Sequence, residues 1–352
     1  MKPPKEDNAL NIIRDQLEYL VGEKADLDND DPFYTISDWL DSGIYPVVNA
    51  GELRFVIEYK SSAQLGVVAR SIEQLSRVAK DKGPEIPLLV VPFMGDVAKR
   101  KCAEAHISWL DLSGNADITG PGLRLYVRGK INKFKQPGRR ENPFAPKSSR
   151  ITRRLVYQPE RTFTQRELAI ETGLGEGFVS RIVKTLEAQH LIVRGDRNRV
   201  SVANPTLLLD VWQQGYDFLK HDIIRGHVSG RSGEEIQDKL SKIFRRENIE
   251  YAATGLGAAW LYSRFAAFRT VSVYLKELPS DDFLKQIGFR DDTAGSNLWL
   301  IMPKDVDVFH AVKPVEDIHC VHPVQVYLDL HGHPERAEEA AVELRRALEL
   351  KK

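Results

Sequence analysis

The sequence predicts an α/β multidomain protein, and three observations support this prediction. The chain has 352 residues, which is longer than one hydrophobic core usually organises. Its composition, with 42% hydrophobic and 28% charged residues, is typical of folded proteins. Helical and strand-like patterns alternate before residue 130 and again after residue 206, with a different composition between. We therefore expect domains over residues 1–130, 148–205 and 206–352, with a linker over residues 131–147.

Charge, cysteine content and hydropathy restrict the compartment. The 50 basic residues balance 50 acidic ones, so the formal net charge is zero. Cys102 and Cys320 have no paired spacing, which favours a reducing compartment over a disulfide-bonded framework. The N-terminus lacks the apolar core of a signal peptide, and the nearly apolar run at residues 86–94 is too short to span a bilayer. We expect a cytoplasmic protein with no membrane partner.

The first 130 residues alternate between helices and strands. Leu10, Ile13 and Leu17 recur at helical spacing, and a turn at residues 49–52 joins two strand-like runs. The expected elements are a helix over 8–21, strands over 45–49 and 53–58, a helix over 65–81, a strand over 87–92, a helix over 96–105, and strands over 107–112 and 123–128. This order predicts a single α/β domain.

Glu58 and Lys60 form a Glu-x-Lys sequence at the end of one predicted strand, just before a helix. With the surrounding order of helices and strands, residues 8–130 resemble the PD-(D/E)xK nuclease-like fold, which implies a restriction-endonuclease-like α/β domain. In that family two carboxylates hold Mg²⁺ and the lysine positions or activates water. The preceding strand, at residues 45–48, has no acid, and Asp41 is the residue that a shifted strand would bring into place.

Two hypotheses follow for this domain. In the first it is a degenerate scaffold without catalytic residues, in which Glu58 is a solvated charge, because one carboxylate and a lysine hold Mg²⁺ poorly. In the second it is a metal-dependent DNA endonuclease that uses Asp41, Glu58 and Lys60. The sequence favours the first. We interpret Asp111 as a structural residue that accepts backbone hydrogen bonds in a strand-end turn, rather than as a catalytic acid.

Positive charge is concentrated between residues 128 and 154, where ten basic residues face one acid, Glu141. These basic residues are Arg128, Lys130, Lys133, Lys135, Arg139, Arg140, Lys147, Arg150, Arg153 and Arg154. Three prolines and a glycine interrupt any regular element there. We interpret the segment as a basic linker, whose charge is either simply solvated or in contact with nucleic acid.

Residues 161–202 carry the most specific pattern of the sequence. Thr164 is a suitable N-cap for a helix over residues 165–172, and Glu167 stands at the capping-box position. Gly173 ends this helix, and a tight turn leads to a second helix over residues 178–190.

Two short β runs follow, at residues 191–194 and 199–202, with a turn between them. Helix, turn, helix and hairpin occur in the order that resembles the winged helix-turn-helix family of bacterial transcriptional regulators, over residues 148–204.

The resemblance implies contact with double-stranded DNA. Arg181 and Lys184 point outward from the second helix and have the reach to meet base edges in the major groove. Arg194, Arg197 and Arg199 on the hairpin are expected along phosphates, where contacts depend on salt and carry little sequence information. Three polar residues complete the expected DNA contacts: Thr164, Gln165 and Ser180. A winged helix can instead bind protein, but the excess of basic residues favours DNA.

The remaining residues return to α/β patterning. The expected elements are helices over 207–219, 233–247 and 251–265, and strands over 271–275, 298–301 and 324–328. The segments 253–260, 324–330 and 336–341 resemble the C-terminal domain of AbiE-type antitoxins of type IV toxin–antitoxin systems. That domain itself resembles a nucleotidyltransferase, so the resemblance implies a nucleotidyltransferase-like α/β domain.

Nucleotidyl transfer is not expected from these residues. That chemistry needs a Gly-Ser turn for phosphates and an Asp-x-Asp strand for two metal ions. The corresponding turn carries Gly255 and Gly257, and the strand carries Ser272 instead of carboxylates. The acidic pair Asp305 and Asp307 follows a proline, and we interpret it as part of a loop.

Histidine and cysteine are enriched near the C-terminal end, at His310, His319, Cys320, His322, His331 and His333. Their spacing fits no standard zinc pattern, and His322 with Pro323 is interpreted as the start of the strand at residues 324–328. We expect neither a metal nor a cofactor.

These observations predict a DNA-binding transcriptional regulator, similar to type IV antitoxins, that binds an operator through its winged helix. The alternative is the metal-dependent endonuclease at Glu58 and Lys60. The resemblance implies a cognate toxin protein as a partner. The flanking α/β domains are expected to support dimerisation, giving a homodimer, or partner binding.

Overall fold

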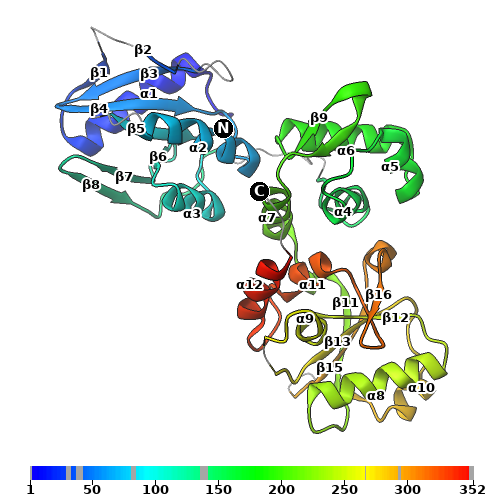
Figure 1. The fold of residues 1–352 in the computed structure, drawn as a ribbon. Coiled ribbons are helices and arrows are strands. Elements are labelled where there is room, and N and C mark those ends of the chain that lie inside the picture. Colours follow the sequence, from blue (N-terminus) through cyan, green and yellow to red (C-terminus); the bar gives the residue numbers. More distant parts are fainter. Residues whose placement is uncertain are drawn as a thin grey trace. The chain divides into compact units, whose positions relative to one another are not determined.

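The computed structural model describes residues 2–28, 33–36, 43–80, 85–134, 142–265, 267–291 and 295–348 (Figure 1). The chain divides into two compact units. The first holds Met1–Arg140 and Ala188–His190, and the second holds Glu141–Glu187 and Leu191–Lys352. Apart from Ala188–His190, the residues expected as a winged helix and those expected as a C-terminal domain therefore belong to one unit.

The first unit contains a mixed β-sheet with helices on both faces. Its elements are α1 (Glu6–Val21), β1 (Ala25–Leu27), β2 (Phe33–Ile36), β3 (Gly43–Ala50), β4 (Leu53–Tyr59), α2 (Leu65–Lys80), β5 (Ile86–Val91), α3 (Asp96–Glu104), β6 (Ser108–Asp111), β7 (Ala116–Gly120) and β8 (Leu123–Val127). The strand order is β1-β3-β4-β5-β6-β7-β8, and β2 pairs with β3. The adjacent strands β4, β5 and β6 are parallel, and α2 and α3 make the crossovers between them.

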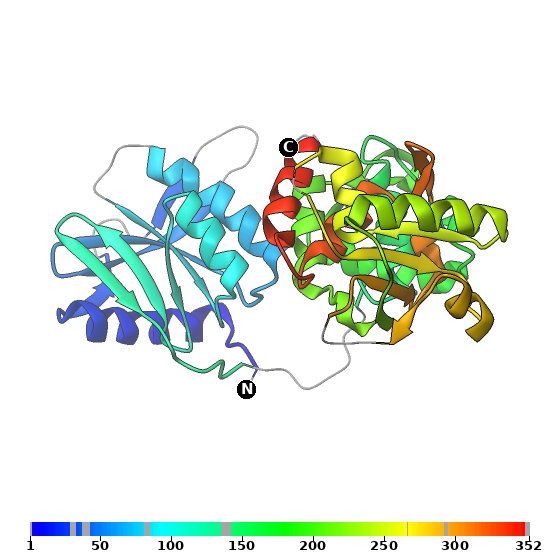
Figure 2. The same ribbon diagram turned by 90° about the horizontal axis from the view of Figure 1, so that it is seen from below.

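The core of the first unit lies between α1 and the sheet. Ala9, Ile13 and Leu17 form one stripe of α1, are fully buried and pack against strand residues such as Phe55 and Leu88. Each large buried side chain contributes roughly 1.5–3 kcal/mol. Figure 2 shows α1 on one face of the sheet and α2 and α3 on the opposite face.

The second unit begins with three helices and a hairpin. They are α4 (Ser149–Tyr157), α5 (Gln165–Thr172), α6 (Glu176–Ala188), β9 (Ile192–Arg194), the 3₁₀ turn η1 (Asp196–Asn198) and β10 (Val200–Val202). The strands β9 and β10 are antiparallel, and Phe163 before α5 pairs with Val200. The predicted helices and hairpin are confirmed, and α4 contains the last three arginines of the basic run at residues 128–154, which we interpret from the sequence as a linker.

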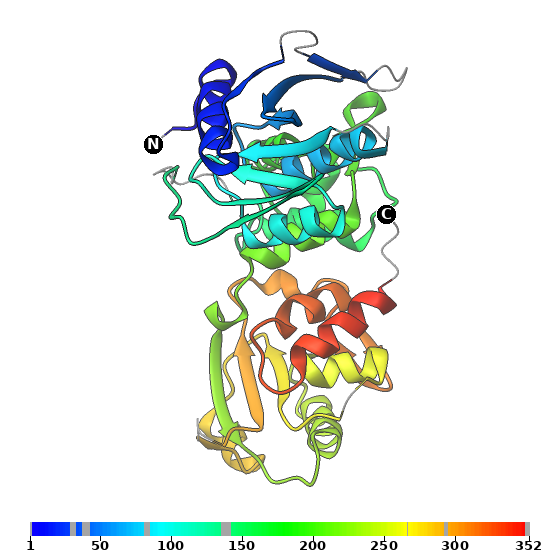
Figure 3. The same cartoon turned by 90° about the vertical axis from the view of Figure 1, so that its left-hand side faces the viewer.

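The rest of the second unit is built around another mixed sheet. Its elements are α7 (Pro205–Gly215), η2 (Phe218–Lys220), β11 (Asp222–His227), α8 (Gly233–Arg246), β12 (Tyr251–Thr254), α9 (Gly255–Ser263), β13 (Val271–Leu275), α10 (Asp281–Gln286), β14 (Arg290–Asp291), β15 (Leu298–Met302), η3 (Val306–Phe309), β16 (Lys313–Val315), β17 (Ile318–Cys320), α11 (Pro323–Leu330) and α12 (Ala337–Ala347). The strand order is β14-β11-β15-β13-β12-β17-β16. Figure 3 shows α9, α11 and α12 gathered on one side of this sheet.

The strand predicted over residues 324–328 is wrong, because these residues lie in α11. Pro323 occupies the first turn, where a missing N–H costs nothing, and His322 Nδ1 accepts a hydrogen bond from the N–H of Val324. Every residue from Val324 to Leu330 is buried, so the apolar run carries no strand-specific alternation.

Two other predicted helices have different bounds. Residues 251–254 of the helix expected over 251–265 form β12, and the helix starts at Gly255, whose φ of +58° suits a residue without Cβ. The helix expected over 207–219 ends at Gly215. Within the described residues, no helix combines the length and the hydropathy needed to cross a membrane.

Candidate nucleic-acid interface

The start of α5 is fixed by a reciprocal pair of hydrogen bonds. Thr164 Oγ1 accepts from the N–H of Glu167 at 3.1 Å, and Glu167 Oε2 accepts from the N–H of Thr164 at 2.6 Å. These bonds hold the pKa of Glu167 below its ordinary value. At the other end Gly173 is left-handed, with φ of +66°. The predicted capping box and helix end are confirmed, and the Thr164 hydroxyl is engaged in the cap.

Helix α6 presents one apolar face and one polar face. Val179, Ile182 and Val183 are buried, whereas Arg181 and Lys184 are exposed. Ser180 on α6 and Gln165 on α5 are half-buried. The two side chains expected to meet base edges therefore stand on the solvent face, as a recognition helix requires.

Phe178, in the first turn of α6, contacts two cations. Lys147 Nζ is 5.7 Å from the ring centroid, and the guanidinium carbon of Arg181 is 5.6 Å from it. Such cation–π contacts favour a fixed position of the ring and of both charges. Phe178 is not among the residues predicted to contact DNA, and Lys147 was expected in the linker, although an aromatic residue at the start of the second helix is a signal visible in the sequence.

Two hairpin arginines have acidic partners within the domain. Arg194 donates to both carboxylate oxygens of Glu187, with N···O distances of 2.9 and 2.7 Å, and this contact lowers the pKa of Glu187. Arg199 donates to Thr162 Oγ1 at 2.8 Å and lies 3.1 Å from Glu167. Their phosphate contacts stay a prediction, and such contacts require these pairs to be exchanged or shared.

Arg197 differs from these two residues. It lies in η1 at the tip of the hairpin, is exposed, and has a left-handed φ of +53°. This conformation is uncommon for a residue with a Cβ and sets the direction in which the side chain leaves the turn.

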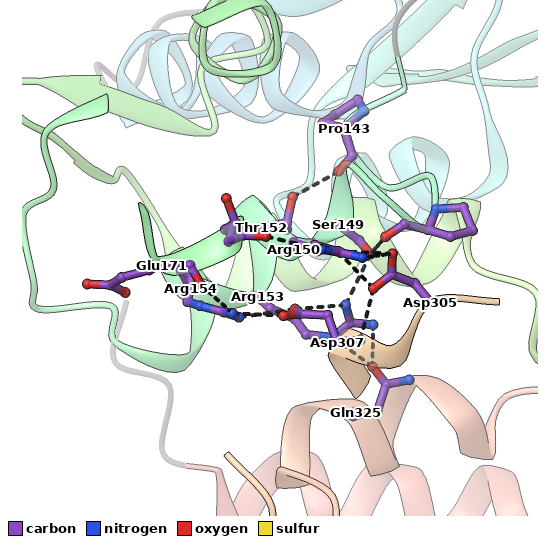
Figure 4. A network of polar contacts seen from close by, with 12 residues as sticks. Pro143, Ser149, Arg150, Thr152, Arg153, Arg154, Glu171, Asp305, Asp307 and Gln325 are labelled. Atoms are coloured by element: carbon purple, nitrogen blue, oxygen red, sulfur yellow. Dashed lines mark hydrogen bonds and ion pairs between the residues drawn. The ribbon is translucent and has the colours of Figure 1, made fainter. Parts of the chain in front are cut away.

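The helix α4 carries three arginines that bind acidic residues far along the chain (Figure 4). Arg150 donates through Nε and Nη2 to the two oxygens of Asp305, both at 2.9 Å. Arg154 donates through Nη2 and Nη1 to the two oxygens of Asp307, at 2.8 and 3.0 Å. Arg153 lies 3.4 Å from Asp307 and donates to Gln325 Oε1 at 2.9 Å.

These contacts correct the interpretation of the charge run between residues 128 and 154. Arg153 and Arg154 are each only 3% exposed, so they are not solvated linker charges. Asp305 lies in a bend, as expected for a loop, whereas Asp307 lies in the 3₁₀ turn η3. Asp305 caps η3 by accepting from the N–H of Asp307 at 2.9 Å, and both acids serve the arginines of α4.

The polar network continues from Gln325 into the sheet. Gln325 Nε2 donates to Asp329 Oδ1 at 2.7 Å and to the Tyr216 hydroxyl at 3.0 Å. The Tyr216 hydroxyl also donates to Asp329 at 2.6 Å, and Thr254 donates to the other oxygen of that carboxylate. Burial raises the pKa of Asp329 to about 6, although its three donors act in the opposite direction.

Glu58 is not the solvated charge expected at the end of its strand. It is 8% exposed, its Oε1 lies 2.7 Å from Lys60 Nζ, and Ser71 Oγ donates to the same oxygen at 3.5 Å. Asp41 lies outside the described residues, and β3 contains no acid. The carboxylate and the lysine that the nuclease alternative requires therefore pair with each other.

Asp111 has the structural role expected from its turn. It is fully buried and accepts hydrogen bonds from the backbone N–H groups of Met94, Ser113 and Asn115 at 2.9–3.1 Å. The Asp111 carboxylate is therefore engaged by backbone donors, as a structural residue in a strand-end turn would be.

The histidines near the C-terminal end take part in separate structural contacts. His322 stacks on Tyr157 with ring centroids 3.7 Å apart, and His333 Nε2 is 2.8 Å from Ser272 Oγ. Burial raises the pKa of the Cys320 thiol to about 12. Among the described residues, no group of three or more His, Cys, Asp or Glu side chains is arranged to hold a metal ion.

Comparison with known proteins concerns the C-terminal part of the second unit. No curated protein and no solved structure matches the chain. A protein-family model does match residues 201–349. This segment includes Asp305, Asp307 and Gln325, the residues that bind the arginines of α4. Residues 201–349 match the family model described as transcriptional regulator, AbiEi antitoxin, type IV TA system, so this segment is similar to that family of antitoxins.

Proposed function

We propose that the protein is a DNA-binding transcriptional regulator of the antitoxin type, which binds an operator through α6 and the β9–β10 hairpin. One observation carries the proposal: the exposed face of α6 presents Arg181 and Lys184, and Phe178 at the start of the helix contacts two cations. The family match of residues 201–349 to transcriptional regulators supports the same function.

The proposed role of each residue follows from the exposure of its side chain and from its hydrogen-bond and ion-pair partners. Arg181 and Lys184 read base edges, because a helix in the major groove specifies sequence through its outward side chains. Arg197 at the hairpin tip contacts phosphate, a contact that adds affinity for any sequence. Arg194 and Arg199 orient the hairpin through Glu187 and Thr162, and turn partly to phosphate when DNA is bound.

The other parts of the chain have supporting roles in this proposal. The first unit is a scaffold, since Glu58 is neutralised by Lys60 instead of being presented to a metal. The C-terminal part of the second unit positions α4 through Asp305 and Asp307, and it binds a cognate toxin protein, as the family match suggests.

The test begins with selection of binding sites from a random duplex library by the full chain, followed by titration at several salt concentrations. Arg181→Ala is expected to weaken binding to the selected sequence by about 1–3 kcal/mol. Arg197→Ala is expected to weaken binding to every sequence and to flatten the salt dependence.

The matched control is Lys242→Ala on α8, whose side chain is 65% exposed and lies outside the proposed interface. Its affinity and salt slope are expected to equal those of the unmodified protein. Unchanged affinity for both Arg181→Ala and Arg197→Ala would remove the winged helix from the DNA interface.

A further inference from the structure

A groove of about 1060 Å³ lies on the first unit, between α1 and the chain that follows β8. Figure 2 shows that segment running beside α1. One wall comes from α1 with Ile12, Asp15 and Tyr19, and the other contains Lys130 and Ile131. The groove is thus formed within one unit, beside α1.

The groove exposes an unusual amount of apolar side chain. Tyr19 is 86% exposed, Ile131 is 80% exposed and Ile12 is 36% exposed. Single exposed apolar residues are common on protein surfaces, but several that line one groove indicate a binding surface. Ile12 and Tyr19 are seven residues apart, so they form a second apolar stripe on α1, separate from the stripe that fills the core.

The two walls of the groove carry opposite charges. Asp15 stands on α1 between Ile12 and Tyr19 and is exposed. Lys130 and Lys133 are exposed on either side of Ile131 on the opposite wall. A partner that fits this groove therefore presents a basic apolar strip to α1 and an acidic apolar strip to the other wall.

A second copy of the same chain has this pattern. In a twofold contact the same patch is used on both molecules, so α1 of one copy meets the segment around Ile131 of the other. The acidic strip with Ile12 and Tyr19 then faces the basic strip, and the reciprocal contact forms at the same time. Tyrosine at the centre of such a patch supplies a large contact area for its few rotatable bonds.

We propose that this groove is the interface of a homodimer, in which each copy packs Ile12 and Tyr19 of α1 against Ile131 of the other. The proposal goes beyond DNA binding, because none of these residues belongs to the winged helix. Its consequence for an operator is a pair of half-sites, since two recognition helices are then linked in one particle.

The test measures the mass of the full chain without DNA, by sedimentation velocity over a range of protein concentrations. The expected result is a reversible monomer–dimer equilibrium. Tyr19→Glu and Ile131→Glu are each expected to raise the dimer dissociation constant about tenfold or more, because each places a charge in the apolar centre of the contact. Tyr126→Glu is the matched control. Tyr126 is 45% exposed on β8, does not line the groove, and is expected to leave the equilibrium unchanged.

A charge exchange separates a specific contact from damage to the fold. Asp15→Lys and Lys130→Glu are each expected to weaken the dimer, and the double variant is expected to regain most of the lost affinity. Both single variants should retain the circular dichroism spectrum of the unmodified protein.

Several results would overturn the proposal. They are a monomer at every concentration, a dimer that is insensitive to both glutamate variants, or a dimer that Tyr126→Glu weakens equally. A monomer would also be observed if another segment of the same chain, or a different protein, covers this groove. That outcome is the first of these results. Because the readout contains no DNA, its outcome is independent of whether α6 binds an operator.

Discussion

Arg154 on α4 donates to both carboxylate oxygens of Asp307, although 153 positions separate the two residues in the chain. Arg153 lies 3.4 Å from the same carboxylate, so one aspartate serves two arginines that are each only 3% exposed. An ionised side chain in such a position is costly without its counter-charge. The winged helix and the C-terminal sheet are therefore joined by charges that neither part can leave unpaired.

Replacement of Asp307 by asparagine is expected to lower the free energy of unfolding of the second unit by about 3–5 kcal/mol, the usual effect of removing one partner of a buried ion pair. Urea unfolding followed by circular dichroism measures this change. Asp238→Asn is the control, because Asp238 and its partner Lys242 are 56% and 65% exposed, and its loss should stay below about 1 kcal/mol. Equal, small losses for both variants would show that the buried pair does not hold the two parts together.

Phe178 is expected to contact a thymine methyl group in the major groove, since it is the aromatic residue at the start of the proposed recognition helix. Replacement of thymine by uracil in a selected operator removes that methyl, and binding should weaken by about 0.8 kcal/mol, the value of one buried methylene-sized group. Fluorescence anisotropy with matched thymine and uracil duplexes measures the difference. Phe178→Ala should abolish the difference, whereas Lys184→Ala should lower affinity and retain it. A difference that survives Phe178→Ala would assign the methyl contact elsewhere.

The stability of the second unit is expected to fall between pH 6.5 and pH 4. Burial lowers the pKa of His221, His322 and His333 from 6.5 to about 4. Their stabilising contribution is present above pH 6.5, and it is lost as the pH falls through 4, because the unfolded chain binds these protons first. Each histidine contributes up to roughly 3 kcal/mol over this range.

Asp329 opposes this trend. Its pKa is raised from 3.8 to about 6, so its contribution is present below pH 3.8 and is lost as the pH rises through 6. Three histidines outweigh one aspartate, and the net stability should decrease on acidification. Urea unfolding at several pH values tests the sign. His322→Phe should make the dependence shallower. Stability that rises towards pH 4 would contradict this assignment.

Glu58→Ala is expected to leave DNA binding intact, because the carboxylate is engaged by Lys60 and Ser71 within the first unit. Incubation of the full chain with plasmid DNA and Mg²⁺ or Mn²⁺ tests the endonuclease alternative at the same residue. The expected result is the same plasmid topology with and without the substitution. Metal-dependent cleavage that Glu58→Ala abolishes would establish an active nuclease, and Asp41→Ala then identifies the second acid.

Local patterns predicted much of the fold. The apolar spacing in α2 and α6, the capping box at Thr164 and the end of α5 at Gly173 are decided by neighbours a few positions away, and the structure confirms them. The error at residues 324–328 has a physical cause. A fully buried helix and a buried strand have similar apolar runs, and the Pro323 start was the feature that distinguished them.

The candidate interface was harder to predict because its organisation depends on distant residues. The sequence showed Arg181 and Lys184 on an outward face, but it gave no reason to pair Arg150 with Asp305, 155 positions away. Local charge density placed Arg153 and Arg154 in a solvated linker, whereas tertiary packing buries them. The cations around Phe178 are likewise a tertiary result, since Lys147 and Phe178 belong to different segments.

Helix α4 contacts both the winged helix and the C-terminal part of the second unit. It supplies Ile151 and Leu155, both fully buried, to the winged helix, and it supplies its arginines to Asp305 and Asp307. A molecule that binds the C-terminal sheet more tightly when those ion pairs are intact would also favour the position of α4 in the winged helix that the ion pairs fix. By thermodynamic reciprocity, the operator would then raise the affinity for that molecule by the same factor. Occupancy of the operator would in that case report the concentration of a ligand that never touches DNA.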